Sequence, residues 1–273
     1  MNKRPIPSSG ELLPLIGLGT WAQFDVDSSG AQREELTRVL RCMDENGASL
    51  IDSSPMYGKA ETTVGDLCAN LQPDNYFYAT KVWTSGKEEG VRQMKDSMRK
   101  MKRKAMDLMQ VHNLIDYKTH LKTLREWKEK GMVRYIGITH YLPSAHAELE
   151  RIIKNESIDF VQLNYSIRVK DAEKSLLNCA MDKGVAVLVN EPLEKGSLFS
   201  LVKGKPLPDW ALAYDIHNWV QFFLKYILAH PAVNCVISGT SDPQHMLLNI
   251  SAGQGSLPDE QGRKKMIQFL ASL

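Results

Sequence analysis

Eight short apolar runs recur at fairly regular intervals along this chain of 273 residues, and segments with helical spacing separate most of them. The runs centre on Ile16, Leu50, Tyr78, Leu108, Ile136, Val161, Val187 and Val236. Helical periodicity occurs in residues 34–46, 90–102, 119–130, 144–153 and 171–181. Strands that alternate with helices pair in parallel through right-handed crossovers. Eight such units in a chain of this length favour a closed barrel over an open sheet. We therefore expect an α/β fold, a (β/α)8 TIM barrel that occupies residues 1–273 as one domain.

Two segments outside this repeat also have a predicted form. Ile6 and residues 12–14 flank a Ser8-Ser9-Gly10 turn, which predicts a short N-terminal β-hairpin in which Gly10 supplies the positive φ. Residues 191–210 form the longest stretch without periodicity, and a loop of that length is usually a lid or a binding loop.

Composition excludes several classes of protein. The formal net charge is +2, so a dedicated nucleic-acid surface is not expected, and the basic residues 99–104 are interpreted as the solvated end of an amphipathic helix. No apolar run is long enough to span a membrane, and residues 1–10 have no apolar centre typical of a secretory signal. The four cysteines lack metal or disulfide spacing, and the seven histidines are dispersed, so we expect no metal site. A cytoplasmic monomer that acts on a small molecule is expected, although a signal removed from a precursor would leave no trace.

Four residues with complementary chemistry lie at or just after the ends of three consecutive predicted strands: Asp52, Tyr57, Lys81 and His112. The C-terminal ends of barrel strands share one mouth, so these side chains should meet. A free tyrosine keeps its proton to about pH 10, but a nearby ammonium lowers that pKa and a carboxylate keeps the ammonium charged. With His112 orienting the oxygen, the group can protonate a carbonyl or deprotonate an alcohol, and a nicotinamide cofactor would have to supply the hydride.

Each of these residues also has a structural interpretation. Asp52 alone can cap a turn, Lys81 can be a surface lysine, Tyr57 can be a packed ring, and His112 can be a hydrogen-bonded structural side chain. Their joint placement at one rim favours catalysis over these alternatives.

The motifs around these residues resemble those of the aldo-keto reductases. Residues 52–58 match the D-x4-Y-G signature and are followed by Glu61, and residues 17–21, 80–83, 111–113, 134–138 and 161–165 match further strand motifs in the same order. The resemblance extends from about residue 5 to residue 251 and implies a (β/α)8 reductase that uses NAD(P)H without a metal. It implies that Tyr57 is the general acid, that Lys81 and Asp52 tune it, and that His112 orients the carbonyl. It also places Trp21, Phe24 and Trp83 beside Tyr57 and His112 around the substrate pocket.

The resemblance further implies a set of cofactor-binding positions. These are Gly19, Thr20, Trp21, Thr139, His140, Gln162, Asn190, Glu191, Pro192, Leu193, Lys195, Gly196, Ser238, Gly239, Thr240, Ser241, His245 and Asn249. NADP(H) is favoured on family grounds. NAD(H) is a serious rival, because Gly239 and His245 replace the cations that clamp the 2′-phosphate in many members and Asp242 would repel that phosphate.

The alternative function is a nucleotide-binding sensor or regulatory barrel with little or no turnover. The four intact residues of the predicted site argue against it without excluding slow chemistry.

Overall fold

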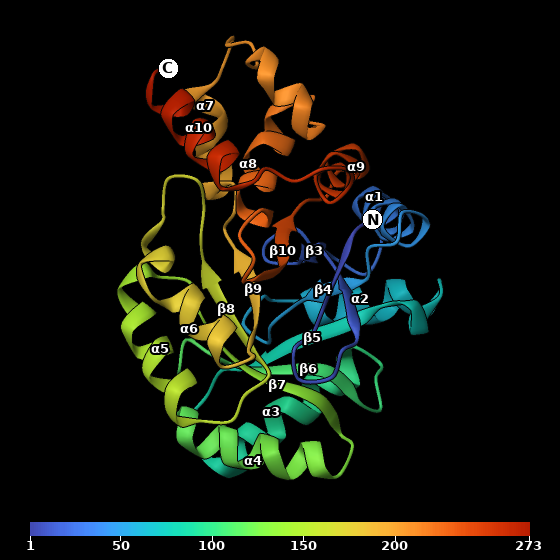
Figure 1. Ribbon diagram of the computed structural model, residues 1–273. Coiled ribbons are helices and arrows are strands. Elements are labelled where there is room, and N and C mark those ends of the chain that lie inside the picture. Colours follow the sequence, from blue (N-terminus) through green and yellow to red (C-terminus); the bar gives the residue numbers. More distant parts are fainter.

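The computed structural model describes residues 1–273, and its centre is a closed barrel of eight parallel strands (Figure 1). Each strand pairs with the next one along the chain, and the last strand closes the ring against the first. The barrel strands are β3 Ile16–Gly19, β4 Leu50–Asp52, β5 Phe77–Val82, β6 Met106–His112, β7 Val133–His140, β8 Phe160–Asn164, β9 Ala186–Asn190 and β10 Val233–Gly239. The predicted (β/α)8 barrel is confirmed, since every predicted centre lies within one of these strands.

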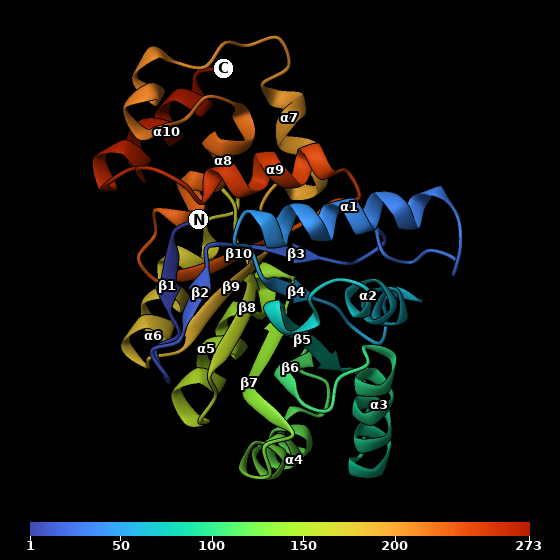
Figure 2. The same cartoon turned by 90° about the vertical axis from the view of Figure 1, so that its right-hand side faces the viewer.

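Helices surround the barrel and follow most of its strands (Figure 2). They are α1 Ala31–Glu45, α2 Ala60–Ala69, α3 Lys87–Lys100, α4 Tyr117–Glu129, α5 His146–Asn155, α6 Leu176–Asp182, α7 Ser197–Leu201, α8 Trp219–Leu228, α9 Pro243–Ala252 and α10 Glu260–Ala271. The helix expected over residues 171–181 is divided, because Ser175, with φ −156°, interrupts it between a 3-10 turn at Asp171–Lys174 and α6. The prediction of a single continuous helix over residues 171–181 was therefore wrong.

Side chains along each strand alternate between the inside of the barrel and the layer beneath the helices. On β6, Leu108 belongs to the apolar cluster inside the barrel, whereas Met109 and Val111 belong to the large core under the helices. Gln110 and His112 share the inward register of Leu108, and both are buried. The barrel interior therefore changes from apolar to polar toward the C-terminal ends of the strands, where the site lies.

A two-stranded antiparallel hairpin closes the other end of the barrel. Its strands are β1 Lys3–Pro5 and β2 Leu12–Pro14, coloured dark blue in front of the barrel in Figure 1. Ile6 and Leu13 of this hairpin join the apolar cluster inside the barrel. Gly10 has φ +76°, so the predicted hairpin and its glycine turn are confirmed.

The segment after β9 is more regular than the sequence indicated. Residues 191–210 were expected to be one irregular loop, but they contain a 3-10 turn at Glu194–Gly196 and helix α7, and a further 3-10 helix starts at Asp209. Together with α8 and α10, this segment forms a helical group on one side of the barrel in both views (Figures 1 and 2). Trp219 anchors the group, because its ring packs against Phe222, Phe223 and Phe269 at centroid distances of 5.1, 5.8 and 6.3 Å.

Ion pairs neutralise most of the basic stretch that begins in the last turn of α3 and continues beyond it. Arg99 and Lys100 pair with Asp96, Lys102 pairs with Asp66, and Arg103 pairs with Asp74. These pairs agree with the interpretation of this stretch as a solvated helix end. The structure contains no helix that is both long enough and apolar enough to cross a lipid bilayer.

Candidate active site

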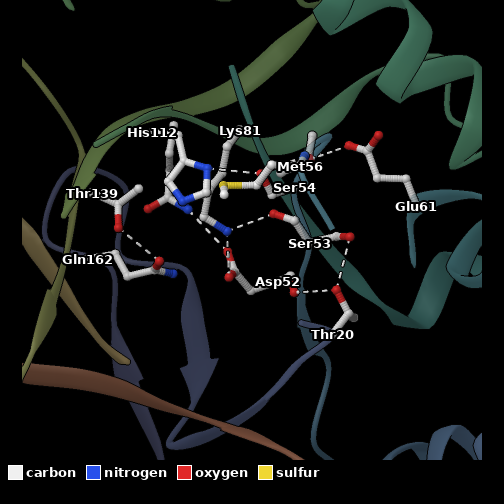
Figure 3. A network of polar contacts seen from close by, with 12 residues as sticks. Thr20, Asp52, Ser53, Ser54, Met56, Glu61, Lys81, His112, Thr139 and Gln162 are labelled. Carbon is white, nitrogen blue, oxygen red and sulfur yellow. Dashed lines mark hydrogen bonds and ion pairs between the residues drawn. The ribbon is translucent and has the colours of Figure 1, made fainter. Parts of the chain in front are cut away.

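The four predicted catalytic side chains come together inside the C-terminal mouth of the barrel. Figure 3 shows three of them, Asp52, Lys81 and His112. Asp52 ends β4, Lys81 lies near the end of β5, and His112 ends β6, all in the inward register. Tyr57 lies in the loop between β4 and α2 and is partly buried against the core. Three neighbouring strands and one loop thus position the group.

Lys81 is the centre of this arrangement. Its side chain is completely buried, and Nζ lies 2.6 Å from Asp52 Oδ2 and 2.7 Å from the carbonyl oxygen of Ser53. Burial alone would lower the pKa of Lys81, but Asp52 and Tyr57 outweigh it and raise that pKa above its ordinary value. The ammonium therefore stays charged at neutral pH.

Tyr57 lies over this ammonium, with 5.2 Å between Lys81 Nζ and the centroid of the tyrosine ring. Burial raises the pKa of Tyr57, and Lys81 counteracts this by favouring the phenolate, while Asp52 and Glu191 oppose ionisation. Lys81 thus lowers the pKa of Tyr57, as predicted. Burial raises that pKa by more than Lys81 lowers it, so the net pKa of Tyr57 is raised. The phenol is therefore protonated near neutral pH, as a proton donor must be.

His112 meets Tyr57 edge-on, with 5.9 Å between the ring centroids. Burial lowers the pKa of His112 to about 3, with further contributions from Lys81 and His140. The imidazole is therefore neutral at physiological pH and carries one proton, on either Nδ1 or Nε2.

Two polar side chains that the sequence analysis did not single out support the group. Gln110 Nε2 donates to Asp52 Oδ1 at 3.2 Å, and Ser54 Oγ lies 2.9 Å from His112 Nδ1. For Gln110 a signal was present in the sequence, since it shares the inward register of His112 on β6. Ser54 had no such signal, because only the folded loop after β4 brings it to the imidazole.

Beside the catalytic group, the mouth contains buried polar atoms that have no partner within the chain. They are Gln162 Nε2, Asn164 Oδ1 and Asn190 Oδ1, and Ser238 Oγ is likewise unpartnered on the side of β10 that faces the helices, in register with Leu18. Thr139 Oγ1 donates to Gln162 Oε1 at 2.9 Å, which orients the amide and leaves its nitrogen unpaired. Unpaired buried amide and hydroxyl groups are costly unless a ligand satisfies them, so these residues fit a polar group such as a nicotinamide carboxamide. Of these, Gln162, Asn190 and Ser238 were predicted cofactor positions, and Asn164 was not.

The segment after β9 crosses toward the loop after β3. Lys195 Nζ lies 3.2 Å from Glu191 Oε1 and 5.5 Å from the centroid of the Trp21 ring. Glu191 Oε2 also accepts a long hydrogen bond, 3.5 Å, from Asn164 Nδ2. The predicted residues of this loop therefore approach the mouth, and Lys195 is held there by a carboxylate of its own segment.

The loop and helix after β10 form the other predicted cofactor region. Asp242 caps α9, since its Oδ1 accepts from the backbone N–H groups of Gln244 at 2.7 Å and His245 at 3.4 Å. The side chain of His245 is exposed, with Nδ1 3.9 Å from Asp242 Oδ2. Many family members bind the 2′-phosphate with two cationic side chains, at the positions of Gly239 and His245 here. No arginine or lysine in this capping turn takes their place.

Two of the aromatic residues assigned to the substrate pocket are exposed near the site, and one is not. Trp21 is 56% exposed and Trp83 is 40% exposed, and Met56 of the loop that carries Tyr57 is also exposed. Phe24 is completely buried in the core under the helices. The assignment of Phe24 to the pocket wall was wrong, because its ring has no exposed surface to offer a substrate.

The sequence profile of the Aldo/keto reductase family matches residues 15–264 of this chain. The chain belongs to that family. Among curated relatives, the "NADH-specific methylglyoxal reductase" of Escherichia coli K12 is 24% identical, covering 95% of this chain and 95% of the relative. "Methylglyoxal reductase YeaE" of the same organism is 24% identical over 86% of this chain and 84% of its own length. Among solved structures, an aldo/keto reductase from Klebsiella pneumoniae in complex with NADP and acetate has a TM-score of 0.82 at 22% identity, covering 99% of this chain and 96% of that one.

Family membership makes this protein an oxidoreductase of the aldo-keto reductase type. The likeness to the Klebsiella pneumoniae enzyme shows the shared (β/α)8 fold. What the neighbouring enzymes bind and reduce belongs to those enzymes, so the roles of individual residues here depend on the geometry described above.

Proposed function

We propose that this aldo-keto reductase converts an aldehyde or ketone to the alcohol with NAD(P)H, and that Tyr57 is the general acid. The observation that carries the proposal is the completely buried Lys81 ammonium, held by Asp52 at 2.6 Å and lying beneath the Tyr57 ring. The fold does not require a buried cation in contact with a phenol. Such a cation does stabilise the phenolate that forms when Tyr57 donates its proton.

Each of the four residues has one task in the proposed reaction. His112 donates a hydrogen bond to the substrate carbonyl oxygen and holds it near Tyr57. Tyr57 then transfers its hydroxyl proton to that oxygen, and Lys81 stabilises the phenolate left behind. Asp52 keeps Lys81 charged and fixed. A bound reduced nicotinamide supplies the hydride that the chain itself lacks.

The unpartnered amides of Gln162 and Asn190 would hold the nicotinamide end of the cofactor, and Ser238, Thr240 and Asn249 would line its adenosine end. NADPH is the favoured coenzyme on family grounds, and NADH is the rival, because the expected 2′-phosphate region carries the carboxylate of Asp242. The exposed rings of Trp21 and Trp83 favour carbonyl substrates with apolar character. Methylglyoxal belongs in the first panel of substrates, since two relatives are named for its reduction.

The test is single-turnover oxidation of bound NADPH or NADH by a reactive aldehyde, compared between the wild-type protein and Tyr57→Phe. We expect the variant to bind coenzyme with unchanged affinity and to lose turnover at least ~100-fold, because only the transferable proton is deleted. Full activity of Tyr57→Phe would refute the assigned acid. A wild-type protein that binds coenzyme but oxidises none with any carbonyl would instead favour the regulatory barrel.

A further inference from the structure

Ser54 and His112 form a buried pair of polar side chains that the proposed reaction does not yet explain. Ser54 Oγ lies 2.9 Å from His112 Nδ1 (Figure 3), Ser54 is completely buried, and His112 is nearly so. Ser54 immediately precedes the Pro55-Met56-Tyr57 segment, so the same loop delivers both the hydroxyl and the phenol to the imidazole.

The hydrogen bonds around Ser54 determine which of the two atoms carries the shared proton. The backbone N–H of Met56 donates to Ser54 Oγ at 3.4 Å, so the hydroxyl oxygen already acts as an acceptor. The single hydroxyl proton has only one acceptor within reach, which is His112 Nδ1. If Nδ1 carried a proton instead, two donors would face Ser54 Oγ and its own proton would be buried without a partner.

The other imidazole nitrogen is left for the substrate. No protein atom accepts from or donates to His112 Nε2, and this nitrogen is not among the fully enclosed polar atoms that lack a partner. A neutral imidazole has one N–H group, and burial keeps His112 neutral by lowering its pKa to about 3. Once Nδ1 is an acceptor, Nε2 is therefore the donor.

We infer that Ser54 is a positioning residue that fixes His112 as the Nε2–H tautomer, so that the imidazole can donate to the substrate carbonyl. This inference rests on the proposed function for its catalytic consequence, but not for the tautomer itself. With the opposite tautomer, Nε2 would present a lone pair to the carbonyl oxygen and repel it. Ser54 thus acts on the reaction only through the histidine.

The decisive measurement is the 15N spectrum of the histidine-labelled protein, in which protonated and unprotonated ring nitrogens are well separated. The His112 signals are assigned by their absence in His112→Gln. We expect wild-type His112 to show a protonated Nε2 and an unprotonated Nδ1. In Ser54→Ala both signals should shift toward averaged values, because the proton can then occupy either nitrogen.

Ser53→Ala is the matched control for the spectrum. The Ser53 hydroxyl is one residue away and accepts from Thr20 Oγ1 at 3.0 Å rather than contacting the imidazole. The tautomer should therefore be unchanged in this variant. A protonated Nδ1 in the wild-type protein, or a spectrum unaffected by Ser54→Ala, would overturn the inference.

The catalytic consequence is read separately from kinetics. Ser54→Ala should lower kcat about tenfold, the size expected for one lost hydrogen bond, while coenzyme affinity is unchanged. A mixed tautomer with undiminished kcat would show that the proton position does not matter to the reaction. If no carbonyl is reduced even by the wild-type protein, the proposed function fails, and the spectrum alone still decides the tautomer.

Discussion

Lys81 and Asp52 form an ion pair in a part of the barrel where water cannot solvate either charge. Such a pair contributes little to stability compared with apolar packing of the same volume, and removing one partner leaves an expensive uncompensated charge. Its presence is therefore better explained by what the ammonium does to Tyr57 than by folding.

Replacing Lys81 by methionine tests this explanation. Without the ammonium, burial and Asp52 both act to keep Tyr57 protonated, so turnover should fall at least ~100-fold and raising the pH should not restore it. The measurement is kcat as a function of pH with saturating coenzyme. The double variant Lys81→Met with Asp52→Asn removes both charges and serves as the folding control. Recovery of activity at high pH in Lys81→Met would contradict the proposed role.

The sequence predicted the catalytic residues of the site better than the side chains that hydrogen-bond to them. Asp52, Lys81 and His112 follow from strand ends, because parallel strands of a barrel share one mouth. The bonds from Ser54 and Gln110 depend on side-chain directions that only the folded loop and barrel determine. Phe24 was assigned to the pocket from the family resemblance, and a sequence match does not say whether a ring ends up exposed to the pocket or buried in the core.

At the scale of elements, the N-terminus of α9 is the feature that suits NADPH, with its 2′-phosphate, least well. Its N-terminal amides, which would suit an anion, already bind the carboxylate of Asp242. Asparagine caps a helix about as well as aspartate but has no charge.

We therefore expect Asp242→Asn to bind NADPH about threefold more tightly, since a single exposed charge is removed, and to bind NADH as before. Fluorescence titration with each coenzyme measures both dissociation constants. Equal changes for the two coenzymes would mean that Asp242 does not face the 2′-phosphate.

Helices α2 and α3 pack so closely that a glycine is required between them. A Cβ atom on Gly65 of α2 would lie 2.0 Å from the carbonyl oxygen of Lys100, which ends α3. Because backbone cannot move aside as a side chain can, we expect Gly65→Ala to destabilise the protein by about 3 kcal/mol.

The corresponding fall in Tm, measured by circular dichroism, should be about 6–10 °C for a chain of this length. Thr62→Ala, on the exposed face of the same helix, should leave Tm nearly unchanged. An equal effect of the two substitutions would contradict the close crossing.

The elements themselves were largely predictable, with two informative exceptions. The strand centres and helices α1, α3, α4 and α5 follow from the apolar periodicity of the local sequence, whereas α2 was not predicted. The division at Ser175 and the helices within 191–210 depend on distant partners. For example, Ser175 Oγ donates to Glu150 of α5, and Phe199 packs against Phe223 of α8.

At the scale of the whole molecule, buried histidines couple stability to pH. Burial lowers the pKa of His112 to about 3 and that of His230 to about 4, whereas an unfolded histidine titrates near ~6.5. Below pH ~6.5 these histidines become protonated in the unfolded chain but stay neutral in the folded protein. The free energy of unfolding therefore falls as the pH drops below ~6.5. Glu61, whose pKa is raised by burial, acts in the opposite direction.

We expect Tm to fall between pH ~6.5 and ~5. His230→Gln should reduce the slope of Tm against pH, because one histidine that is protonated only in the unfolded chain is removed. His217→Gln, at an exposed position, is the matched control and should retain the full slope. Thermal melts across this pH range provide the measurement. An undiminished slope in His230→Gln would show that other groups cause the acid sensitivity.

The closure of the ring by β10 against β3 has a consequence for biosynthesis. β3 is translated before every other barrel strand, and its second neighbour, β10, is the last barrel strand to be translated. Until then the nascent sheet has two bare edges, which are the surfaces most prone to pair with other chains. Arg4 adds a second link across this closure by donating to the carbonyl oxygens of Leu228 and His230, so a residue that precedes the first barrel strand is bonded to the segment that precedes the last one.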